Sequence, residues 1–121
     1  MALTRTYAQD SWSLCDNGET IVTVKETVQD NQVLIQVTGS LRSDTKHSFQ
    51  DELIALTTVG KDLVIDCQGI QYMANACQIA LLDVQRKMDS MHKGSLTLRN
   101  VPENLYADFK KTNLHQLLMI E

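Results

Sequence analysis

Proline, glycine and cysteine are all scarce in this chain of 121 residues. One proline and five glycines argue against long disordered or low-complexity stretches. The three cysteines, Cys15, Cys67 and Cys77, form no CxxC pair, and the first residues lack the apolar core of a secretory signal. An odd number of cysteines without such a signal favours free thiols in a reducing compartment. We therefore expect one compact domain that resides in the cytoplasm.

Excess positive charge and long apolar runs are missing as well. The chain has 11 Lys and Arg against 15 Asp and Glu, which gives a formal net charge of −4. Nucleic-acid binding needs a clustered basic surface, so we expect no nucleic-acid partner. No apolar run is longer than four residues. This excludes a membrane-spanning helix and predicts no direct membrane insertion.

Motifs for catalysis, metal binding or cofactor binding are also lacking. His47, His92 and His115 are not paired at metal-ligand spacing, and the glycines form no phosphate loop. Asp66, at the end of an expected strand, could act as a general base by position. A strand-end aspartate that orders the following loop is the commoner role. We expect a protein that is not an enzyme and needs neither cofactor nor metal.

Strand patterns are present instead, and they alternate with helical ones. The β-branched runs at 21–28 and 33–39 predict an antiparallel hairpin. Three further strands are expected at 63–65, 95–100 and 117–120. Because helical segments separate these later strands, the strands should pair in parallel through right-handed crossovers.

Helix starts are marked by capping residues. Ser43 or Asp44 can cap the first helix, and Asn75 with Gln78 three residues later resembles a capping box before the second. Pro102 suits the first turn of a third helix. The predicted order is β-β-α-β-α-β-α-β, an α/β fold with a mixed sheet, an N-terminal hairpin and helices packed on the sheet.

The chain is expected to divide near its start. Residues 1–18 are polar and poorly periodic, and we interpret them as an N-terminal extension. Residues 19–121 carry the alternating pattern and form the predicted domain.

Cys77 is the sharpest chemical candidate in the sequence. A thiol in the first turn of a helix lies at the positive end of the helix dipole, which favours the thiolate. Cys67 lies ten residues earlier and could approach it to form a redox pair. Cys77 also falls on the apolar face of its helix, where cysteine behaves as a small hydrophobic residue. The core role is preferred, and a thiol redox sensor remains an alternative.

Three segments resemble a STAS domain, the family of anti-sigma-factor antagonists and of domains appended to sulphate transporters. They are VLIQVTGSLRSDT at 33–45, LVIDCQGIQYMANACQIALL at 63–82 and NLYADFKKTNLHQLLMI at 104–120. The resemblance implies a STAS-like fold and a protein–protein interaction module in bacterial signal transduction and transcription regulation.

The resemblance also identifies a degenerate motif. Members of the family carry Asp-Ser-Ser-Gly-Leu where the second helix begins, and a partner kinase phosphorylates the second hydroxyl. Here Ala74 replaces the Asp, Asn75 the first Ser, Ala76 the phosphoacceptor and Cys77 the Gly. Alanine has no hydroxyl group, so the added charge that would drive off a partner cannot be installed at this position.

The function implied by the resemblance is binding of an anti-sigma-factor-like kinase or another regulator of a STAS pathway. An accessory subunit of a transport system, with a transporter as partner, is the alternative. Ser40, Ser43 and Thr45 could be other phosphoacceptors, although turn and cap roles are commoner for such residues. The predicted partner-binding residues are Ser43, Asp44, Tyr72, Met73, Asn75, Ala76, Cys77 and Gln78.

Overall fold

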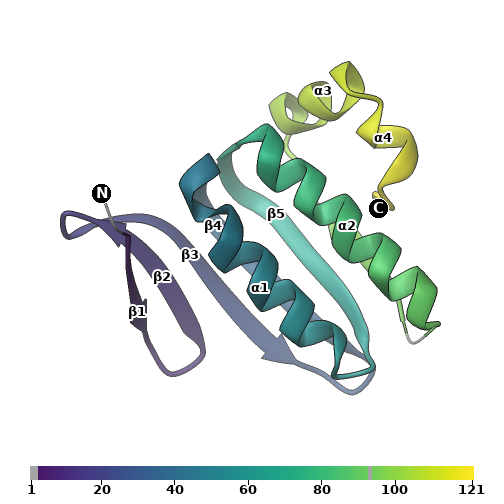
Figure 1. Cartoon of the computed structure of the whole chain (residues 1–121), viewed down its shortest axis with the longest axis horizontal. Coiled ribbons are helices and arrows are strands. Elements are labelled where there is room, and N and C mark those ends of the chain that lie inside the picture. Colours follow the sequence, from purple (N-terminus) through teal and green to yellow (C-terminus); the bar gives the residue numbers. More distant parts are fainter. Residues whose placement is uncertain (1–2, 93) are drawn as a thin grey trace.

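Six strands form one mixed sheet in the computed structural model, which describes residues 3–92 and 94–121 (Figure 1). The first four strands pair antiparallel, whereas β4 pairs with β5 and β5 with β6 in parallel. The strands follow one another across the sheet in chain order: β1 (Thr4–Tyr7), β2 (Ser11–Asp16), β3 (Glu19–Val28), β4 (Gln32–Leu41), β5 (Asp62–Met73) and β6 (Leu96–Arg99).

Helices follow β4, β5 and β6. The long helices α1 and α2 lie side by side across β4 and β5, α3 lies near the start of α2, and α4 lies beside α2 on the side away from α1 (Figure 1). The mixed α/β fold class predicted from the sequence is confirmed. In the described part of the chain the helical elements are η1 (Ser43–Thr45), α1 (Lys46–Thr57), α2 (Asn75–Met91), α3 (Glu103–Lys111) and α4 (Leu114–Leu117).

The core lies between the sheet and these helices. Alternate residues of β4, Val33, Ile35 and Val37, are buried, as the two-residue period of a strand requires. Phe49 and Leu53, one helical turn apart on α1, pack into the same cluster. The predicted hairpin is the β3–β4 pair, in which Val28 lies opposite Val33.

The segment interpreted as an N-terminal extension contributes two strands to the same sheet. Strand β2 pairs with β3, and its Trp12 and Leu14 are buried in the core. Serines at positions 11 and 13 alternate with these two apolar residues, which is the pattern of a half-buried strand that our sequence interpretation overlooked. The boundary at residue 19 itself stays a prediction.

The last predicted strand, at 117–120, is wrong. Leu117 ends the short helix α4, and only an isolated parallel bridge joins Ile120 to Leu98 of β6. The amide groups of Leu98 and Glu121 donate to the carbonyls of Met119 and Leu98, both at 2.8 Å. An apolar run of four residues does not distinguish a strand from a helix by its periodicity.

Strand β5 is much longer than the predicted 63–65, since it continues to Met73. Gly69 lets the later part of β5 approach β4 closely, because an added Cβ would lie 3.0 Å from the Val37 carbonyl oxygen and 2.9 Å from Thr38 Oγ1. The residues read as a loop before the second helix are therefore held rigidly in the sheet.

The predicted helix caps differ from the structure. Ser43 and Asp44 belong to η1, and α1 begins after Thr45 without a side-chain cap. Asn75 is the first residue of α2 rather than its cap, which is Ala74. Pro102 immediately precedes the first residue of α3, close to its predicted place.

Candidate partner-binding site

The junction between β5 and α2 forms what we call the α2 tip, which comprises residues 72–78 together with Ser43 and Asp44 of η1. The amide of Ala74 donates to the Leu41 carbonyl at 2.8 Å, which ties the start of α2 to the end of β4. Amides of Cys77 and Gln78 both donate to the Ala74 carbonyl, at 2.9 and 3.1 Å. The α2 tip is thus tied to β4 by one backbone hydrogen bond, and the other two close the first turn of α2 on itself.

No side chain of the described residues caps the first turn of α2. The amides of the first two residues, Asn75 and Ala76, have no acceptor within a helix, since the carbonyls four residues earlier lie outside it. The 17-residue helix also directs the positive end of its dipole here. The α2 tip therefore offers open donors at its surface.

The predicted binding residues divide into two groups by exposure. Ser43, Asp44, Tyr72 and Asn75 are exposed, and Ala76 is half-buried. In contrast, the side chains of Met73, Cys77 and Gln78 are buried, with exposed fractions of 2%, 0% and 4%.

These fractions correct the predicted contact surface. An exposed Met73 anchor is wrong, because its side chain belongs to the core. The side chains of Cys77 and Gln78 are buried beneath the exposed residues of this surface. Sequence reasoning missed Ile79, which is 45% exposed one turn after Ala76. Ile79 lies opposite the face of α2 that buries Cys77 and Leu81, and this position in the helical period could have predicted its exposure.

Cys77 is held as a core residue. Its Sγ lies 3.4 Å from the Arg42 carbonyl oxygen and 4.0 Å from Thr45 Oγ1. Burial raises the pKa of the Cys77 thiol, and it raises the pKa of Cys67 to about 12 with the help of the neighbouring Asp66 charge. Both thiols are thus held in the protonated form, which is the unreactive one. The core role preferred for Cys77 is therefore supported, and the thiol redox sensor stays an alternative.

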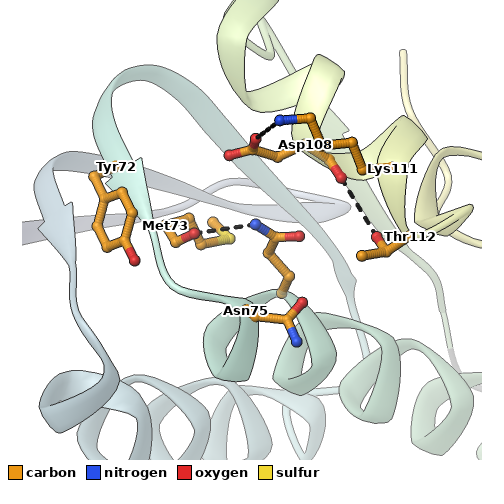
Figure 2. Close-up of a pocket in the computed structure, with 7 residues that line it drawn as sticks. Tyr72, Met73, Asn75, Asp108, Lys111 and Thr112 are labelled. Carbon is orange, nitrogen blue, oxygen red and sulfur yellow. Dashed lines mark hydrogen bonds and ion pairs between the residues drawn. The ribbon is translucent and has the colours of Figure 1, made fainter.

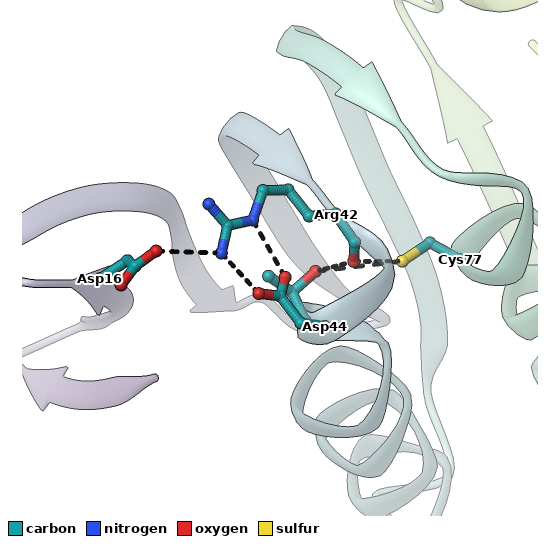
Figure 3. A network of polar contacts seen from close by, with 5 residues as sticks. Asp16, Arg42, Asp44 and Cys77 are labelled. Carbon is teal, nitrogen blue, oxygen red and sulfur yellow. Dashed lines mark hydrogen bonds and ion pairs between the residues drawn. The ribbon is translucent and has the colours of Figure 1, made fainter. Parts of the chain in front are cut away.

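An ion-pair network around Arg42 connects the η1 part of the α2 tip to β2 (Figure 3). The Arg42 guanidinium donates from Nε to Asp44 Oδ1 at 3.0 Å and from Nη2 to Asp16 Oδ2 at 3.4 Å. The hydrogen bond from Arg42 lowers the pKa of Asp44. Thr45 Oγ1 donates to the Arg42 carbonyl at 2.7 Å and is buried, so its hydroxyl is inaccessible to a kinase.

A cavity of about 220 Å³ opens between the α2 tip and α3 (Figure 2). Tyr72 and Asn75 border it on the side of the tip, and Asp108 and Lys111 border it on the side of α3. The residues that line the cavity are Tyr72, Met73, Asn75, Gln78, Asp108, Lys111 and Thr112.

The other candidate, Asp66, lies within β5 rather than at a strand end, which corrects the expectation that it orders a following loop. Its Oδ1 accepts hydrogen bonds from the Gln68 amide at 3.0 Å and from Asn100 Nδ2 at 3.3 Å. Within residues 3–92 and 94–121, no group of three or more His, Cys, Asp or Glu side chains is arranged to hold a metal ion. Over the same residues, no helix has the length and apolarity needed to cross a membrane.

Solved structures share this fold at low sequence identity. An anti-sigma factor antagonist from Mycobacterium paratuberculosis superposes with a TM-score of 0.72 at 14% identity, over 82% of this chain and 84% of that one. The unphosphorylated anti-sigma factor antagonist SpoIIAA gives 0.67 at 14% identity, over 81% and 87%. The murine anion transporter Slc26a9 gives 0.66 at 15% identity, over 93% of this chain but 20% of that one.

Family membership comes from the sequence. No curated protein shows a significant match to this chain. The family model described as "Mlab, STAS domain" matches residues 24–120, which include β4, η1, the α2 tip and all four α-helices. Because this span is well over half of the chain, the protein belongs to the STAS domain family.

Proposed function

We propose that this chain is a non-catalytic interaction module that binds a regulatory protein through the α2 tip and lacks the phosphorylation switch of its relatives. One observation carries the proposal. The α2 tip is rigid and presents Tyr72, Asn75 and Ala76, but the positions matching the family's two hydroxyls carry an amide and a methyl group. The binding surface is kept, and the group that would receive a phosphate is missing.

The composition of the surface supports binding of a protein. Tyr72 is 54% exposed, and Ile79 continues the same end of α2 as a second exposed apolar side chain. Tyrosine is enriched at protein interfaces because its ring buries a large area with little loss of conformational entropy. Such a module binds constitutively, or is regulated by a means other than phosphorylation at Ala76.

The partner class follows from the relatives. One similar structure is that of the Bacillus cell fate determinant SpoIIAA in its phosphorylated form, at a TM-score of 0.62 and 14% identity. By analogy, we expect an anti-sigma-factor-like kinase or another STAS-pathway regulator that acts in bacterial signal transduction and transcription regulation. The cytoplasmic location expected from the sequence stays a prediction.

A charge-and-size variant at the tip tests the proposal. The partner is first identified by affinity purification from the native organism and then expressed in pure form. Ala76→Glu places a bulky carboxylate at the centre of the α2 tip, and we expect its affinity for that partner to fall at least about tenfold, the effect of losing 1.4 kcal/mol. Isothermal titration calorimetry measures the change.

A matched control keeps this test specific. Thr58→Glu adds the same side chain at an exposed position just after α1, at the opposite end of the helix from η1. It should bind as tightly as the unmodified chain. Equal affinities for Ala76→Glu and Thr58→Glu would show that the α2 tip is not the binding surface.

Binding to a transporter is the second candidate, and the likeness to the Slc26a9 anion transporter over 93% of this chain favours it. The same purification distinguishes the two candidates. An integral membrane protein as the tip-dependent partner supports the transport function. A soluble kinase supports the signalling function.

A further inference from the structure

The Gln78 side chain leaves one hydrogen-bonding atom without a partner. Its Nε2 donates to the Met73 carbonyl at 3.0 Å. This bond determines the orientation of the amide, because the flipped amide would set two acceptor oxygens against each other. Among the described residues, Oε1 then has no hydrogen-bond partner, although the side chain is only 4% exposed. Buried acceptors are rarely left unpaired, so this atom points to a ligand.

Gln78 lines the cavity between the α2 tip and α3. On the α3 side, Lys111 and Asp108 carry opposite charges, and their Nζ and Oδ1 atoms are 3.9 Å apart. That distance is too long for a strong hydrogen bond, so each group remains able to bind a ligand. Lys111 and Thr112 are exposed and can move without disturbing the core.

The charges of the cavity select a neutral occupant. An anion would meet the Asp108 carboxylate and the unpaired Gln78 oxygen, both of which repel it. A cation would meet the Lys111 ammonium and the positive end of the α2 dipole. A neutral group with both a donor and an acceptor satisfies every side of the cavity, and a carboxamide is the common protein group of this kind.

We infer that this cavity receives a carboxamide side chain, an Asn or a Gln, of the partner protein that the α2 tip binds. The inference rests on the proposed function and names the chemistry of its contact. The partner's amide N–H donates to Gln78 Oε1. Its carbonyl accepts from Lys111 Nζ or from the amide of Asn75, which lines the same cavity.

Small fragments test the cavity without the partner. The whole chain, labelled with ¹⁵N, is titrated with propionamide, and propionate and propylammonium serve as charged probes of the same shape. We expect propionamide to cause a saturable shift of the Gln78 side-chain amide resonances and to bind more tightly than either charged probe. No saturable shift at Gln78, tighter binding of a charged probe, or equal shifts from all three would overturn the inference.

Two variants assign the effect to the cavity. Lys111→Met should weaken propionamide binding at least about tenfold, the loss expected for one hydrogen bond to a charged group. Lys87→Met, an exposed lysine on α2 away from the cavity, should change nothing. Gln78→Met would remove both the amide that reports binding and its bond to Met73, so Lys111→Met is the variant that leaves the buried amide in place.

The results are independent of the test of the proposed function. A cavity that fails to bind propionamide, while Ala76→Glu still weakens partner binding, refutes only the carboxamide contact. A cavity that binds propionamide, while Ala76→Glu has no effect on the partner, refutes the α2 tip as the binding surface.

Discussion

Glu26 has a partly buried carboxyl group that faces a second carboxyl group across the packing between β3 and α1. Burial and a hydrogen bond with Glu52 raise its pKa from 4.5 to about 7, although the Trp12 indole, which donates to it at 3.2 Å, lowers it. Arg5 donates to Glu52 at 2.7 Å and lies over the Trp12 ring at 4.0 Å. Below neutral pH, Glu26 thus carries a proton that lets both acids lie together.

The raised pKa predicts how stability depends on pH. Between pH 4.5 and 7 the folded state holds a proton that the unfolded state has lost, so the free energy of unfolding falls as pH rises. Above pH 7 the Glu26 carboxyl group is ionised in both states, so it no longer makes the free energy of unfolding depend on pH. One proton gives at most about 1.4 kcal/mol per pH unit, and the partial exposure of Glu26 reduces the value.

The variant Glu26→Gln checks this prediction. It should remove the part of the pH dependence of the free energy of unfolding that Glu26 causes, and it should raise the urea midpoint at pH 8. Urea unfolding followed by circular dichroism from pH 5 to 8 measures both. Glu19→Gln, at an exposed position of the same strand, serves as the control and should follow the unmodified chain. If Glu26→Gln and the unmodified chain have the same pH profile, the Glu26 pKa is not raised.

At the scale of the element, β5 determines where the α2 tip lies. The strand runs to Met73 and pairs with β4 up to Leu41, with shifts in register on either side of the Gly69 pairing. Only Ala74 then separates the end of the strand from the first residue of α2. The surface that we assign to a partner is therefore an extension of the sheet rather than a flexible loop.

Gly69→Ala tests this role of β5. The new Cβ would press on the backbone of β4 at Val37, and we expect a loss of about 1–3 kcal/mol in the free energy of unfolding. Gln68→Ala changes the exposed neighbour in the same strand and should stay within about 0.5 kcal/mol. Urea unfolding of both variants provides the comparison. If the Gly69→Ala protein were as stable as Gln68→Ala, an added Cβ would fit between β4 and β5 without strain.

The whole molecule depends on its first strands. Trp12 and Leu14 of β2 are part of the core, and the Arg5–Glu52 ion pair connects β1 to α1. Residues before position 19 therefore complete one side of the structure. They lie outside the span matched by the family model, which is residues 24–120.

Trp12→Ala measures that contribution. We expect it to lower the free energy of unfolding by about 3–5 kcal/mol, as for other buried large aromatic residues. Tyr7→Ala removes an aromatic side chain that is 72% exposed on β1, and it should have little effect. Deleting residues 1–18 should lower the melting temperature at least as much as Trp12→Ala. If the truncated chain had the same melting temperature as the full chain, residues 1–18 would instead be a dispensable extension.

The sequence by itself determined the local features of this protein. The β-branched runs of β3 and β4, the helical period of α2 and the missing hydroxyl at Ala76 all depend on residues near one another in the chain. These features were sufficient to predict the fold class and the family.

Tertiary structure alone decided which of those residues reach the surface. Met73 and Cys77 were expected at a binding surface and are buried, and Trp12 was assigned to an extension and lies in the core. Gln78, also expected at that surface, is buried, and its amide oxygen has no hydrogen-bond partner among the described residues. Burial depends on neighbours that are distant in the chain, so no local pattern of residues specifies it.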